Sequence, residues 1–127
     1  MNTRLLQTVS LAVLGVCGVV GLFAPEVLLS AINMAFVTPH WPVQLLAAAW
    51  LGLATLNWST RGFAMGGILG RPVVLANFAH YFIAAASTVR PVLAGGRPGP
   101  LAVLVVFGLL AAAYGYLLLA PTPGGLK

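Results

Sequence analysis

Four long apolar stretches, none of which contains a charged side chain, constrain this chain more than any other feature. They cover residues 5–24, 43–60, 72–89 and 101–120. Each is close to the roughly 20 residues that an α-helix needs to cross the hydrocarbon core of a bilayer. Lipid offers no water to backbone N–H and C=O groups, so helices are the expected structure. We therefore predict an all-α fold, an integral membrane four-transmembrane-helix bundle, with one domain over residues 1–127.

The scarcity of charge supports this prediction and excludes several functional classes. Charged residues make up 6% of the 127 residues, whereas soluble domains have about 25%. Glu26 is the only acid, which leaves too few carboxylates for a paired-carboxylate enzyme or an oxygen-ligand metal cage. The arginines are isolated rather than clustered, so we expect the lipid bilayer, and not nucleic acid, as a partner. Cys17 stands alone, without a disulfide partner.

The connection between the first two stretches, residues 25–42, lacks lysine and arginine. Leu28, Ile32 and Phe36 recur at every fourth position, which is typical of one face of a helix. We predict a short interfacial helix here, lying on the membrane between transmembrane helices 1 and 2. His40 and Trp41 would then lie at headgroup level, where tryptophan is favoured.

The distribution of basic residues predicts the orientation. Cytoplasmic connections carry an excess of lysine and arginine. With the N-terminus inside, four basic residues are cytoplasmic and two are outside: Arg4, Arg61, Arg71 and Lys127 against Arg90 and Arg97. This bias favours a multi-pass protein with both termini inside. High alanine, glycine and proline content, with arginine in preference to lysine, suggests a bacterium and hence a bacterial inner membrane.

Polar side chains within the second and third stretches are the candidate functional residues, because such groups are costly inside a membrane. Their spacing places them on one face of each helix. At about 1.5 Å per residue, the two asparagines lie at similar depth in antiparallel helices. We therefore predict one polar cluster between these helices. Its members are Trp50, Asn57, Arg61, Asn77, His80 and Tyr81.

Two interpretations of this cluster remain open. Interhelical hydrogen bonds from asparagine and histidine are ordinary stabilising contacts in membrane bundles, and we favour this interpretation. The alternative is a ligand or substrate pocket. No cofactor and no metal site are predicted. A haem, pigment or quinone contact at His80 is the weaker alternative, since the second histidine, His40, lies in a connection on the outer side.

Small residues that recur every three or four positions mark the faces on which helices approach closely. They occur in the first and fourth stretches, as Gly15, Gly18, Gly108, Ala111, Ala112 and Gly115. We interpret them first as packing within the bundle. The alternative is a face for a partner subunit or for a second copy of the chain.

One segment resembles a known pattern. Leu56-Asn57-Trp58, Arg61-Gly62, Gly66-Gly67-Ile68, Arg71-Pro72-Val73, Asn77 and His80 are similar to a motif of small four-helix bacterial membrane proteins. The similarity covers about a fifth of the chain. It implies a four-helix bundle in a bacterial inner membrane and brings no activity with it.

These observations favour a non-catalytic protein, because the chain lacks a catalytic set of serine or cysteine with histidine and acid. We expect a structural or accessory subunit of a larger membrane complex, in contact with other membrane subunits or a second copy. The alternative is a small-molecule binder or transporter, as a single chain or as a homodimer, that uses the polar cluster.

Overall fold

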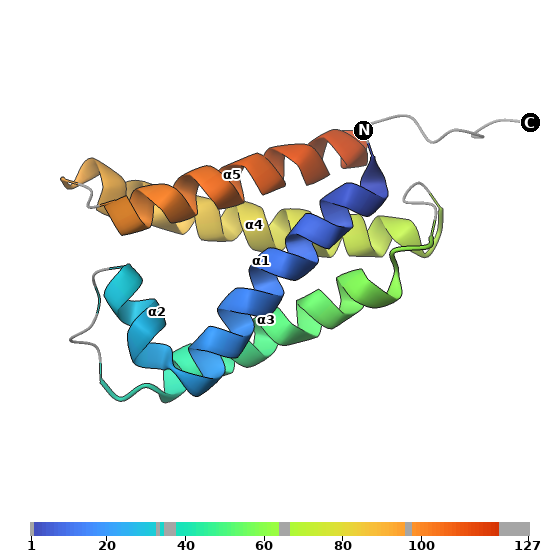
Figure 1. Ribbon diagram of the computed structural model, residues 1–127. Coiled ribbons are helices and arrows are strands. Elements are labelled where there is room, and N and C mark those ends of the chain that lie inside the picture. The colour runs from blue at the N-terminus through green and yellow to red at the C-terminus, as the bar shows by residue number, and fades with distance from the viewer. Residues whose placement is uncertain (1, 33, 35–37, 64–66, 96–97, 120–127) are drawn as a thin grey trace, which may run out of the picture.

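Where the structure describes the chain, its regular structure consists of helices. The computed structural model describes residues 2–32, 34, 38–63, 67–95 and 98–119. These residues form α1 (Thr3–Phe23), α2 (Pro25–Ala31), α3 (Trp41–Ser59), α4 (Gly70–Leu93) and α5 (Pro98–Leu119) (Figure 1). The all-α prediction is confirmed. Helices α1, α4 and α5 are long and apolar enough to cross a membrane, which suggests a multi-pass membrane protein.

The helix boundaries follow familiar local signals. The side chain of Asn2 caps α1 by accepting a hydrogen bond from the backbone N–H of Leu5 (3.2 Å). Pro25 begins α2 and Pro42 lies in the first turn of α3, where a missing N–H costs nothing. Beyond the end of α4, Gly95 adopts a positive φ of 106°, a conformation that favours glycine.

The four long helices associate as two pairs. Helix α1 packs along α3, and α4 packs along α5, whereas α1 with α5 and α3 with α4 touch only over short stretches. Figure 1 shows the pairs converging where α1 begins and separating toward α2. We call the convergent end, formed by the start of α1, the end of α3, the start of α4 and the end of α5, the Arg61 end. The opposite end is the Glu26 end.

Close backbone approach explains the packing of α1 on α3. Gly18 is buried, and a Cβ atom there would lie 2.7 Å from Leu51 Cγ and 3.1 Å from the Ala47 carbonyl oxygen. Only glycine fits this contact without displacing a neighbour. Gly115 plays a similar part between α5 and α4, where an added Cβ would lie 3.1 Å from the Phe78 ring.

The short helix expected between the first two stretches is present as α2, but it is shorter than the predicted apolar face. It ends at Ala31, so Ile32 is its C-cap, and Phe36 lies outside the described residues. Leu29 is buried. At Gly99 of α5, a Cβ atom would collide with the carbonyl of Ala31. Helix α2 therefore contacts α5 at the Glu26 end, where the two helix pairs separate.

Candidate functional site

Asn57 and Asn77 form the centre of the polar interior. Both side chains are fully buried, on α3 and α4. Asn57 Nδ2 donates to Asn77 Oδ1 at 2.8 Å, and Asn77 Nδ2 donates to Asn57 Oδ1 at 2.9 Å. Asn77 Nδ2 also donates to the Val73 carbonyl at 2.9 Å. The two carboxamides thus satisfy each other across the point where the helix pairs meet.

A second buried hydrogen bond joins α1 to the end of α3. Gln7 Nε2 donates to Thr60 Oγ1 at 3.1 Å, and the Thr60 hydroxyl donates to the Leu56 carbonyl at 2.8 Å. The hydroxyl therefore accepts one hydrogen bond and donates another. Gln7 Oε1 is buried and has no hydrogen-bond partner among the described residues.

A third buried hydrogen bond joins α5 to α1. The Tyr114 hydroxyl donates to Ser10 Oγ at 2.9 Å, and both side chains are fully buried. With the asparagine pair and the Gln7–Thr60 contact, all four long helices contribute to one set of buried polar side chains near the Arg61 end. We call this set, Gln7, Ser10, Asn57, Thr60, Asn77 and Tyr114, the polar layer.

A cluster of aromatic side chains lies beside the polar layer. The Tyr81 ring stacks on Tyr114 with centroids 5.9 Å apart and meets Phe107 edge-on at 5.4 Å. His80 packs against Tyr81 at 5.2 Å and against Phe107 at 6.0 Å. Within the described part of the chain, the buried atoms Trp50 Nε1, His80 Nε2 and Tyr81 Oη have no hydrogen-bond partner.

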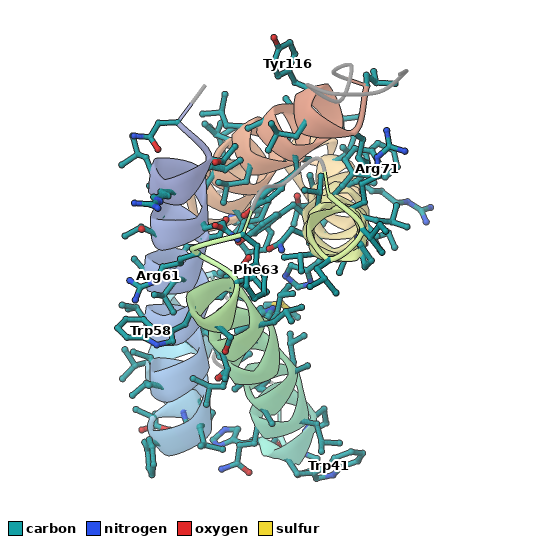
Figure 2. All side chains as sticks on the ribbon, turned by 90° about the vertical axis from the view of Figure 1, so that its right-hand side faces the viewer. Trp41, Trp58, Arg61, Phe63, Arg71 and Tyr116 are labelled. Atoms are coloured by element: carbon teal, nitrogen blue, oxygen red, sulfur yellow. The ribbon has the colours of Figure 1, made fainter. Side chains whose placement is uncertain are left out.

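The structure brings together some residues of the predicted cluster and separates others. Asn57 contacts Asn77, and His80 contacts Tyr81 on α4. Trp50 packs against the apolar core that contains Tyr81. Arg61 lies apart, because its guanidinium carbon stacks 3.6 Å above the centre of the Trp58 ring. Figure 2 shows both of these side chains on the same outer flank of the molecule.

The small residues also divide into two groups. Gly18, Ala111 and Gly115 pack against other helices. Gly15 and Gly108 have open space above them, and Ala112 is exposed. A shallow, open groove runs between α4 and α5, and the residues that line it are apolar, among them Phe78, Phe82, Ala85, Gly108, Ala112 and Gly115.

Sequence reasoning missed the polar groups of α1 and α5. Gln7 and Ser10 lie on the same face as Leu14, Gly18 and Gly21, and all five are buried. Their spacing was a usable signal for a buried face. Thr8 weakens that signal, since it is just as polar but is exposed and donates to the Arg4 carbonyl.

The described residues contain no group of three or more histidine, cysteine, aspartate or glutamate side chains placed to hold a metal ion. The polar layer instead offers amides and hydroxyls, which form hydrogen bonds between helices. Comparison with family models, with curated proteins and with solved structures gives no match to this chain.

Proposed function

We propose that this chain is a non-catalytic, four-span protein of a bacterial inner membrane that serves as a structural or accessory subunit of a larger membrane complex. The observation that carries this proposal is the apolar groove between α4 and α5. Its small residues, Gly108 and Ala112 among them, leave room for the close approach of another helix. The side chains of the polar layer, by contrast, already form hydrogen bonds with one another.

Four spans require that α3 crosses the membrane with the other three long helices. Its 19 residues correspond to about 28 Å, close to the roughly 30 Å of a hydrocarbon core. Trp41 and Trp58, near its two ends, are 59% and 56% exposed. Tryptophan is enriched at both membrane interfaces, so this arrangement supports a spanning α3. Helix α2 would then lie at the interface of the Glu26 end.

The same geometry supports our proposal for the orientation of the chain. The start of α1, the end of α3 and the start of α4 bring Arg4, Arg61 and Arg71 to the Arg61 end. Arg90 lies near the end of α4 at the opposite end. Because basic residues favour the cytoplasmic side, we place the Arg61 end, and with it both termini, in the cytoplasm.

A partner subunit of this kind would present an apolar transmembrane helix to the groove. Among the described residues that line the groove, none has a polar side chain that would recognise a soluble ligand. Phe78 and Phe82 stack with centroids 5.5 Å apart along its α4 side. Lipid or a partner helix would cover such a surface in a membrane, and small residues favour the helix through close backbone contact.

Native mass spectrometry of the protein extracted gently from its own membrane tests the proposal. We expect peaks in which other subunits accompany the chain in fixed ratio. Gly108→Leu fills the groove and should abolish those peaks. Gly52→Leu is the matched control, because Gly52 on α3 also has open space around it and lies outside the groove. A chain that always runs alone in mild detergent contradicts the proposal.

A second candidate function is a small-molecule binder or transporter, in which Trp50, His80 and Tyr81 meet a ligand. The observation in its favour is their buried polar atoms without partners in the described residues. His80→Phe keeps an aromatic ring against Phe107 and removes the imidazole nitrogens. If this function holds, the wild-type protein carries an extra bound mass that the variant loses while remaining folded. An absorbance spectrum of the pure protein detects haem or a pigment.

A further inference from the structure

Arg61 is held in a defined position at the end of α3. Its guanidinium carbon lies 3.6 Å from the centre of the Trp58 ring, and its Nε donates to the Trp58 carbonyl at 3.3 Å. Stacking and this hydrogen bond orient the planar group. The two Nη groups form no hydrogen bond with the described residues, and these are the donors that match phosphate oxygens.

The surface of the Arg61 end carries both apolar and cationic side chains. Phe63 and Leu69, in the connection to α4, are 48% and 67% exposed. Arg4 and Arg71 are exposed at the starts of α1 and α4. Figure 2, which views this end of the molecule, shows Arg61 and Arg71 on opposite flanks, with Phe63 between them. The only acidic side chain of the chain, Glu26, belongs to the opposite end.

We propose that the Arg61 end binds the headgroups of anionic phospholipids, with Arg61 on Trp58 as the residue that binds the lipid phosphate. This goes beyond the proposed subunit function and does not depend on it.

The chemistry of the neighbours selects a lipid headgroup. An indole ring prefers the boundary between acyl chains and headgroups, so Trp58 holds the Arg61 guanidinium at phosphate level. Exposed Phe63 and Leu69 suit contact with acyl chains on the same surface. Arg4 and Arg71 add positive charge without a neighbouring carboxylate, which favours a lipid of net negative charge over a zwitterionic one.

Native mass spectrometry of the full chain in micelles with equal amounts of phosphatidylglycerol and phosphatidylcholine of matched acyl chains tests this inference. We expect preferential retention of phosphatidylglycerol. Arg61→Gln should lower the fraction with bound phosphatidylglycerol about fivefold, the effect of one basic residue near a membrane surface. Arg90→Gln is the control, because it removes the same charge at the opposite end.

Further outcomes are decisive in either direction. Arg61→Lys keeps the charge and loses the planar stacking group, so this variant should retain phosphatidylglycerol at a level between those of the wild type and Arg61→Gln. If Arg61→Gln does not fold, Arg61→Lys takes its place in the test. Equal retention of both lipids by the wild type overturns the inference. So does equal loss in Arg90→Gln, wild-type retention in both Arg61 variants, or full displacement by inorganic phosphate at matched ionic strength.

Discussion

The carboxamides of Asn57 and Asn77 exchange two hydrogen bonds, 2.8 and 2.9 Å long, at the place where α3 meets α4. These two helices touch only over a short stretch, since each packs mainly against another helix. The asparagine pair is therefore a principal polar link between the two helix pairs, and the Tyr114–Ser10 hydrogen bond is another.

Replacing one asparagine should lower the free energy of unfolding by more than the loss of its own hydrogen bonds would suggest, because its partner is left unpaired. Asn77→Leu leaves the buried carboxamide of Asn57 without a partner. An unsatisfied buried polar group costs about 1–3 kcal/mol, and interhelical hydrogen bonds in membranes contribute about 0.6–2 kcal/mol. We expect the free energy of unfolding to fall by about 2 kcal/mol, as measured by titration from mild detergent into sodium dodecyl sulfate.

The double variant separates pairing from simple loss of polarity. Asn57→Leu with Asn77→Leu removes both groups, so it should cost clearly less than the sum of the single variants. Ser87→Ala is the control, because Ser87 is exposed on α4 and bonds only the Ile83 carbonyl of its own helix. Additive costs in the double variant would show that the two carboxamides are not coupled.

The same substitution should have different effects on protein stability at two glycines of α1. Gly18→Ala places a Cβ atom 2.7 Å from Leu51 Cγ, so we expect a loss of about 1–3 kcal/mol in the free energy of unfolding. Gly15 has nothing within 4 Å, so Gly15→Ala should be neutral or stabilise by up to about 1 kcal/mol. Thermal unfolding followed by circular dichroism measures both, and similar melting temperatures would contradict the close packing of α1 on α3.

The Tyr114 hydroxyl should stabilise the contact of α5 with α1. Tyr114→Phe keeps the ring that stacks on Tyr81 and removes the donor to Ser10. We expect a loss of about 1 kcal/mol in the free energy of unfolding. Tyr116→Phe is the matched control, because Tyr116 is 63% exposed, and its effect should stay within about 0.5 kcal/mol. Equal effects of the two variants would show that the hydrogen bond from Tyr114 to Ser10 does not stabilise the protein.

Helix positions and the Asn57–Asn77 contact were accessible from the sequence, because both depend on local spacing. Proline, glycine and asparagine mark where helices begin and end, and a rise of about 1.5 Å per residue gives the depth of each side chain. Two asparagines at equal depth in antiparallel helices have few other partners. The hydrogen bonds between them agree with that argument.

The association into two pairs was not accessible in this way. In a soluble helix, polar residues mark the face that avoids the core. Helix α5 is apolar all round: Phe107 and Leu110 are buried, while Val105 and Leu109 are exposed. The hydropathy of α5 therefore does not mark the face that meets α4. Its small residues do not settle the face either, because Ala111 and Gly115 are packed whereas Gly108 and Ala112 are open. The position of Arg61 was missed for a related reason, since helical spacing gives direction but does not reveal that a neighbouring indole competes for the guanidinium.

The path of α3 decides whether the chain has four spans. If α3 crosses the membrane, Ser30 on α2 and Gly62 after α3 lie on opposite sides. If α3 stays on one surface, they lie on the same side. Both residues are exposed, and Cys17 is the only natural cysteine, so Cys17→Ala provides a background for single-cysteine labelling.

With α3 across the membrane and the Arg61 end inside, Gly62→Cys should react with an impermeant maleimide only in inside-out vesicles. Ser30→Cys should react only in right-side-out vesicles. Ala94→Cys is the control: it is exposed at the Glu26 end, after α4, and should follow Ser30→Cys. Reaction of Ser30→Cys and Gly62→Cys from the same side would refute four spans. The reverse of the expected pattern would still be consistent with four spans. It would mean the opposite orientation, in which the basic residues at the Arg61 end face outward.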